Sequence, residues 1–128
     1  MPEKKTIERA RRAKEEGKRP GTQAGEFVRE EMDHIREGKH GARSTKQAIA
    51  IGLSKARRSG VKLSPPRNGQ ASTRTRKQAQ RDLARGRSGR KASPARSAAS
   101  KRALKREGAS AASRSAISRQ ARSAARKR

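Results

Sequence analysis

The chain contains no cysteine, tryptophan or tyrosine, and a single phenylalanine is its only aromatic side chain. Without cysteine it can form no disulfide, no thiol nucleophile and no cysteine-ligated zinc site. Its longest apolar run has six residues, Ala48 to Leu53, whereas a membrane-spanning helix needs about 20. The first residues carry no apolar stretch of the kind that a secretory signal requires. These absences predict a soluble intracellular protein without a membrane partner.

Acidic residues are scarce and unevenly placed. There are 11 against 37 lysines and arginines, which gives a formal net charge of +26. Residues 1–37 hold 10 basic and 9 acidic side chains, residues 38–66 hold 7 basic and none acidic, and residues 67–128 hold 20 basic and 2 acidic. A field of this strength attracts phosphate backbones. We therefore expect a nucleic acid as the partner.

Large apolar residues are also scarce, and least frequent after the break at Pro65 and Pro66, which is a strong stop signal. Residues 67–128 contain 15 alanines and 10 serines but only three large aliphatic residues, which is too few for a core. We therefore predict a mainly α protein. A small unit of two to three helices, the head at residues 1–66, precedes a basic, largely disordered tail at residues 67–128.

The tail can still form helix when its charge is neutralised, because Ala, Arg and Lys have high helix propensity. Its last stretch has the clearest pattern. On a helical wheel, Ile117 shares one face with alanines, and four arginines lie opposite. Such a helix would lay a row of arginines along phosphates.

Three segments of the head have helical patterns. The segment 2–16 has Ile7 as its only large apolar residue beyond Met1, so we expect a mobile, mostly solvated helix. The segment 22–37 repeats apolar residues every three or four positions, at Ala24, Phe27, Val28, Met32 and Ile35. Glu31 falls inside this stripe. We favour an edge carboxylate paired with a nearby Lys or Arg over a buried, perturbed one.

The third helix, predicted at residues 44–59, has the clearest boundaries. Ser44 and Gln47 fit a capping box at its start, and Gly60 with Val61 fits a C-terminal stop. Gly52 predicts close approach of another helix. Ile51 points away from the main apolar stripe, so this helix is buried on two sides or touches a second copy of the chain in a weak homodimer.

Catalytic constellations are missing, so we predict no enzyme and no cofactor. No GxxxxGK[ST] loop occurs, and the serines have no positioned base. The only histidines, His34 and His40, could join Asp33 and Glu37 at a metal, but the spacing matches no known signature. We therefore predict no metal site, and histidines that are exposed or touch phosphate.

Positive charge without aromatic interleaving predicts contact with phosphates rather than stacking on bases. The start of the third helix also offers free amides to a phosphate. A helix–turn–helix is disfavoured, because the connection Gly38 to Arg43 is longer than the usual tight turn. The predicted nucleic-acid-binding residues are Lys39, Arg43, Lys46, Lys55, Arg57, Arg58, Lys62, Arg114, Arg119, Arg122 and Arg126.

These features favour a nucleoid-associated, histone-like protein that neutralises and bridges duplex DNA without base readout. Two alternatives stay open. One is an RNA- or ribosome-associated protein, and the other is an adaptor whose head binds a protein through the stripe of the segment 22–37.

Two runs of the head, TQAGEFVREE at residues 22–31 and GKHGARSTKQAIAIGL at residues 38–53, are distinctive. With them, residues 1–66 resemble a family of small basic bacterial proteins of unassigned function. The resemblance implies a bacterial cytoplasm and carries over no catalytic residue. The tail resembles bacterial histone H1-like proteins in composition only, which implies a location on the nucleoid.

Overall fold

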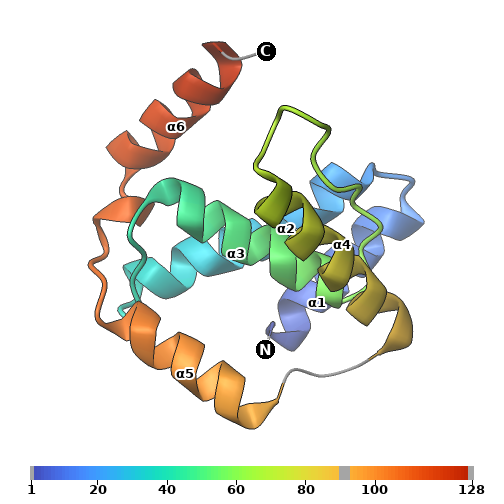
Figure 1. Ribbon diagram of the computed structural model, residues 1–128, viewed down its shortest axis with the longest axis horizontal. Helices are drawn as coiled ribbons and strands as arrows, with labels where there is room; N and C mark the ends of the chain where they lie inside the picture. The colour runs from blue at the N-terminus through green and yellow to red at the C-terminus, as the bar shows by residue number, and fades with distance from the viewer. Residues whose placement is uncertain (1, 90–92, 127–128) are drawn as a thin grey trace.

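The computed structural model describes residues 2–89 and 93–126. All of the named secondary-structure elements in this part of the chain are helices (Figure 1). Six α-helices and one short 3₁₀ turn follow one another: α1 (Lys4–Glu15), α2 (Pro20–Arg36), α3 (Thr45–Arg58), α4 (Thr73–Ser88), α5 (Pro94–Lys105), η1 (Ser110–Ala112) and α6 (Arg114–Arg126).

The boundaries of α3 confirm the sequence signals. The Ser44 hydroxyl accepts the amide of Gln47 at 3.1 Å, and the Gln47 side chain reaches back one residue further than expected, to the amide of Arg43 at 2.7 Å. Gly60 has a φ of +102°, and the following amide, that of Val61, donates to the carbonyl of Ala56 at 3.0 Å. Local capping chemistry therefore fixes both ends of this helix.

Helix α1 docks along α2 through one face, while most of its residues stay exposed, as expected of a mostly solvated helix. Thr6 and Ala10 are buried in the contact, and the Thr6 hydroxyl donates to Oε1 of Glu30 at 3.0 Å. Ile7, the residue on which the expectation rested, stays 43% exposed. Small and polar side chains hold α1 against α2. A count of large apolar residues could not predict this contact.

The prediction of a largely disordered tail was wrong, because the described part of residues 67–128 forms α4, α5, η1 and α6. Helix α4 packs against α3. Asp82 of α4 is buried and accepts hydrogen bonds from Ser54 at 2.8 Å and Gln78 at 3.1 Å. The two backbones come close, because a Cβ on Gly86 would lie 2.1 Å from the Arg57 carbonyl oxygen. One buried carboxylate and one glycine thus replace the apolar side chains that the tail lacks.

The tail also completes the core of the head. Ala111 and Ala112 of η1 are buried together with Met32 and Ile35 of α2. The Thr45 hydroxyl donates to the Ala111 carbonyl at 2.6 Å, and Arg36 donates from Nε to the Ala112 carbonyl at 3.0 Å. Because alanines supply this packing, the scarcity of large aliphatic residues did not reveal it.

Helix α3 therefore lies between α2 and α4. A Cβ on Gly52 would lie 2.6 Å from Cα of Val28, so Gly52 permits the predicted close approach, with α2 as the neighbour. The two sides of α3 are therefore covered by α2 and α4 of the same chain. A second cluster, around Phe27 and Ala56, fills the space between α1, α2, α3 and the loop at Val61.

The last two long helices are the least enclosed. None of the described helices packs against α5, whose end is tied to the loop before α3 by hydrogen bonds from Gly41 and Ala42 to the carbonyls of Leu104 and Gly108. Helix α6 packs Ile117 on the core and then projects from the body (Figure 1). The C-terminal helix allowed by the sequence is present. Every helix in the described ranges is too short or too polar to cross a bilayer.

Candidate nucleic-acid interface

Basic and acidic side chains neutralise one another on α1 and α2. Arg9 pairs with Glu26 at 3.0 Å, and Arg36 with Asp33 at 3.7 Å. Glu3 gathers His34, Lys5 and Lys39 around its carboxylate, with His34 contributing most, and this lowers the pKa of Glu3 to about 2. This half of the molecule presents little net charge to a polyanion.

Helices α5 and α6, here called the cationic arms, lack such neutralisation. Their lysines and arginines are exposed, and none of them pairs with a carboxylate in the described part of the chain. The two acidic residues of the segment 67–128 do not compensate them, since Asp82 is buried under α4 and Glu107 lies in the loop after α5. The exposed cations of the arms are Arg96, Lys101, Arg102 and Lys105 on α5 and Arg114, Arg119, Arg122 and Arg126 on α6.

Four of the predicted binding residues are engaged within the protein. Lys55 contacts the buried carboxylate of Glu31, and Arg58 lies 3.8 Å from Asp82. Lys39 pairs with Glu37 at 3.3 Å and with Glu3 at 3.4 Å, and these carboxylates, Glu37 foremost, raise its pKa. The fourth is Arg57.

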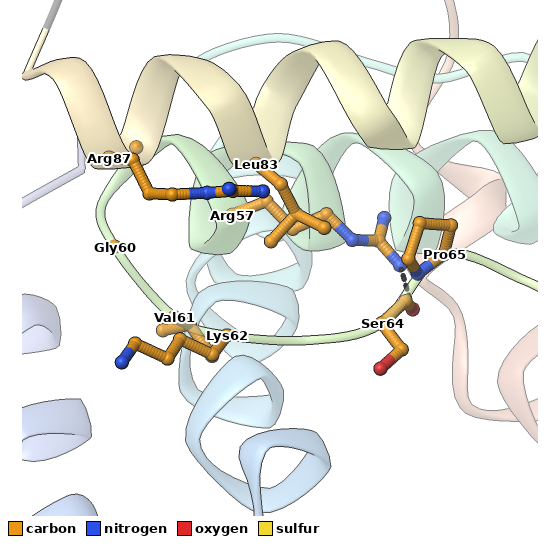
Figure 2. Close-up of a pocket in the computed structure, with 9 residues that line it drawn as sticks. Arg57, Gly60, Val61, Lys62, Ser64, Pro65, Leu83 and Arg87 are labelled. Carbon is orange, nitrogen blue, oxygen red and sulfur yellow. Dashed lines mark hydrogen bonds between the residues drawn. The ribbon is translucent and has the colours of Figure 1, made fainter.

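Arg57 is buried and braces the loop after α3. Its guanidinium donates to the carbonyls of Leu63 and Ser64, both at 3.1 Å, and burial lowers its pKa. Arg57 lines a cleft of about 510 Å³ between this loop and α4. Figure 2 shows it beside Leu83 and Arg87, which α4 contributes. Lys62 and Arg87 are exposed beside the cleft, so the fold brings one predicted cation together with one that the prediction omitted.

Arg43 and Lys46 are exposed at the start of α3, as a phosphate site there requires. The rest of α3 is covered by α2 on one side and α4 on the other. This packing leaves little of the surface of α3 free, whereas a recognition helix lays an exposed face in the major groove. Lys46 and Ala50 are the only residues within α3 that are exposed in the described part of the chain.

The prediction named cations on α6 but none on α4 and α5. The exposed cations of α4 include Arg74, Lys77, Arg81 and Arg87. The charge imbalance of residues 67–128 was the available signal. Because the rest of the tail was expected to be disordered, no particular cation outside its last stretch could be selected.

Glu31 and the two histidines also lie differently from the prediction. Glu31 does pair with a lysine, Lys55, but it is fully buried rather than at an edge. The side chains of His34 and His40 are only 12% and 7% exposed. They are therefore not the solvent-exposed or phosphate-contacting histidines that were expected.

The fold and charge pattern define a small all-helical protein with a self-neutralised half and two cationic arms. The chain matches DUF6496, a family of unknown function, over residues 4–68. It therefore belongs to this family, as the resemblance indicated. The match covers α1 to α3 and ends in the loop before α4. No curated protein and no solved structure matches the chain.

Proposed function

We propose that this protein binds duplex DNA through its phosphates, without base specificity, as a nucleoid-associated, histone-like protein of the bacterial cytoplasm. The observation that carries the proposal is the exposure of eight cations on α5 and α6 without a carboxylate partner in the described residues. Each such cation can replace a condensed counterion on a phosphate, and release of that counterion favours binding.

The geometry suits a rod-like polyanion. The α5 helix buries no residue of its own, and α6 contacts the body mainly through η1 and α3, so both helices offer most of their surface to a ligand. They leave the body separately on either side of η1 (Figure 1). Two separate arms can contact two duplexes, which supports bridging as well as neutralisation.

The test is a salt series on the full chain with random-sequence duplex DNA. A variant with four α5 cations replaced by glutamine is compared with a variant that loses four cations from α1 and the loop after it. The first carries R96Q, K101Q, R102Q and K105Q, and the control carries K4Q, R12Q, K14Q and K18Q, all exposed positions.

Both variants have the same net charge, so only the position of the charge differs. If all four α5 cations touch phosphate, the slope of log K against log salt becomes shallower by about 3 to 4 units. The control slope should stay close to that of the wild type. Equal slopes in the two variants would contradict binding through α5.

RNA remains the second candidate, because phosphate contacts do not by themselves select DNA. Tighter binding to structured RNA than to duplex DNA at equal salt would reassign the function to RNA. The adaptor hypothesis loses its proposed surface, since Phe27, Met32 and Ile35 are buried in the core.

A further inference from the structure

A cluster of potential metal ligands lies away from the cationic arms, where α2 meets the loop before α3. It consists of Glu31 and His34 on α2 and His40 in the loop. One ligand atom from each residue lies within 4.8 Å of the others. Glu31 and His34 are three positions apart, so they share one face of the helix.

One oxygen of Glu31 accepts no hydrogen bond from the described residues, although a histidine nitrogen lies next to it. Its side chain is fully buried, and Lys55 contacts Oε1. Oε2 accepts no hydrogen bond in the described part of the chain. A buried carboxylate oxygen left in this state is costly, and it indicates that something else satisfies it.

The His40 ring is oriented toward that oxygen. Its Nδ1 lies 2.9 Å from the carbonyl oxygen of Gly41, and a carbonyl can only accept, so Nδ1 carries a proton. In the neutral ring, Nε2 then presents a lone pair. This atom lies 3.1 Å from Oε2 of Glu31, so two acceptors face each other. In metal sites, one ring nitrogen of a histidine commonly donates to a backbone carbonyl, which leaves the lone pair of the other nitrogen for the metal.

The spacing suits a small divalent cation. Zinc ligands at about 2.0–2.2 Å in a tetrahedral site lie about 3.3–3.6 Å from each other. His40 Nε2 and Glu31 Oε2 are 3.1 Å apart, and the His34 ligand atom lies within 4.8 Å of both. The His34 ring stands edge-on to the His40 ring, with centroids 6.2 Å apart, and Nε2 of His34 contacts Glu3 at 3.2 Å. Two imidazoles and one carboxylate form a set that zinc prefers, with room for a fourth ligand.

We propose that Glu31, His34 and His40 bind a zinc-type divalent transition metal ion, and that this ion joins α2 to the loop before α3. The ligand set differs from the one that sequence spacing suggested, since the exposed Asp33 and Glu37 take no part. A second group, Glu3, Glu30 and His34, shares one histidine with it. It contains one imidazole instead of two. Oε1 of Glu30 accepts the Glu3 amide and the Thr6 hydroxyl, whereas its Oε2, like that of Glu31, accepts no hydrogen bond in the described residues.

The test uses the full chain, stripped of metal with a chelator and titrated with Zn²⁺ alone in a calorimeter. Binding of one ion per chain is expected. His34→Gln and His40→Gln should each weaken the affinity at least about tenfold, whereas Glu37→Gln and Glu30→Gln should leave it unchanged. Co²⁺ bound to the wild-type chain should show the visible absorption of a tetrahedral site, a readout that does not depend on any variant folding.

Several results would overturn the proposal. They are the absence of saturable binding to the folded wild-type chain, retention of affinity in both histidine variants, or a loss in Glu30→Gln with none in Glu31→Gln. Absence of binding would mean that a proton, rather than a metal ion, lies between His40 Nε2 and Glu31 Oε2. His40 would then be an imidazolium, and Glu31 would pair with both His40 and Lys55. The last would place the ion in the second group.

Discussion

Replacing Asp82 with alanine should loosen α4 from α3. Asp82 is 1% exposed and is the only acidic residue on α4. Its two carboxylate oxygens accept hydrogen bonds from Ser54 of α3 and Gln78 of α4. Arg58 of α3 also lies 3.8 Å from this carboxylate, so Asp82 meets two polar side chains of α3. No large apolar side chain of α4 is buried.

The magnitude follows from these contacts. A hydrogen bond to a charged acceptor contributes about 1.5–3 kcal/mol, and two are lost. The variant no longer buries a carboxylate, which returns part of that loss. We expect the free energy of unfolding to fall by about 2–4 kcal/mol, a large share of the total for a small protein.

The assay is urea unfolding of the full chain followed by circular dichroism, with hydrogen exchange to locate the effect in α4. Asp33→Ala is the matched control. The Asp33 side chain is about half exposed and its pairing with Arg36 is long, so its loss should change little. In a double-mutant cycle with Ser54→Ala, the coupling energy should be about 1 kcal/mol. Equal stability of the Asp82 and Asp33 variants would refute the reasoning.

Two further predictions concern backbone contacts and capping. Gly86→Ala should destabilise the protein by about 1–3 kcal/mol in urea unfolding, because its Cβ would meet the Arg57 carbonyl. Gly25 lies in the open on α2, so Gly25→Ala should instead stabilise the protein by about 0.5–1 kcal/mol. A gain from both would contradict the close crossing of α3 and α4. Ser93→Ala removes the cap that accepts the third amide of α5 at 3.2 Å, and should cost that helix about 1 kcal/mol, measured by hydrogen exchange. Ser97→Ala, inside the same helix, should slow exchange instead.

Sequence reasoning succeeded where the signal was local. The cap at Ser44, the stop at Gly60 and the close approach at Gly52 all depend on neighbours in the chain or on one missing Cβ. The face of α2 with Phe27 and Ile35 followed from helical periodicity, because large apolar residues at that spacing can be buried on one side only.

It failed where burial depends on distant small or polar groups. Ala111 and Ala112 belong to the core only because α2 and Thr45 lie opposite them. Asp82 holds α4 only because Ser54 faces it. An alanine or aspartate carries no periodic signal of such a partner. A rule that counts large aliphatic residues therefore assigned these segments to disorder.

The candidate binding residues divide along the same line. Lys46 and Arg122 could be selected from charge alone, and both are exposed. Lys55 and Arg57 could not be distinguished from them, because their burial follows from Glu31 on α2 and from the carbonyls of the loop after α3.

The position of η1 in the core affects how the protein is made on the ribosome. The cluster around Phe27 is complete once Val61 has been synthesised. The cluster around Ile35 is complete only after Ala112 has been added. At about 5–20 residues per second, synthesis of the intervening segment takes roughly 3–10 s. During that interval the Met32 and Ile35 side chains have no cover from η1. Chaperones and proteases can therefore reach these side chains after α3 has formed and before Ala112 has been added.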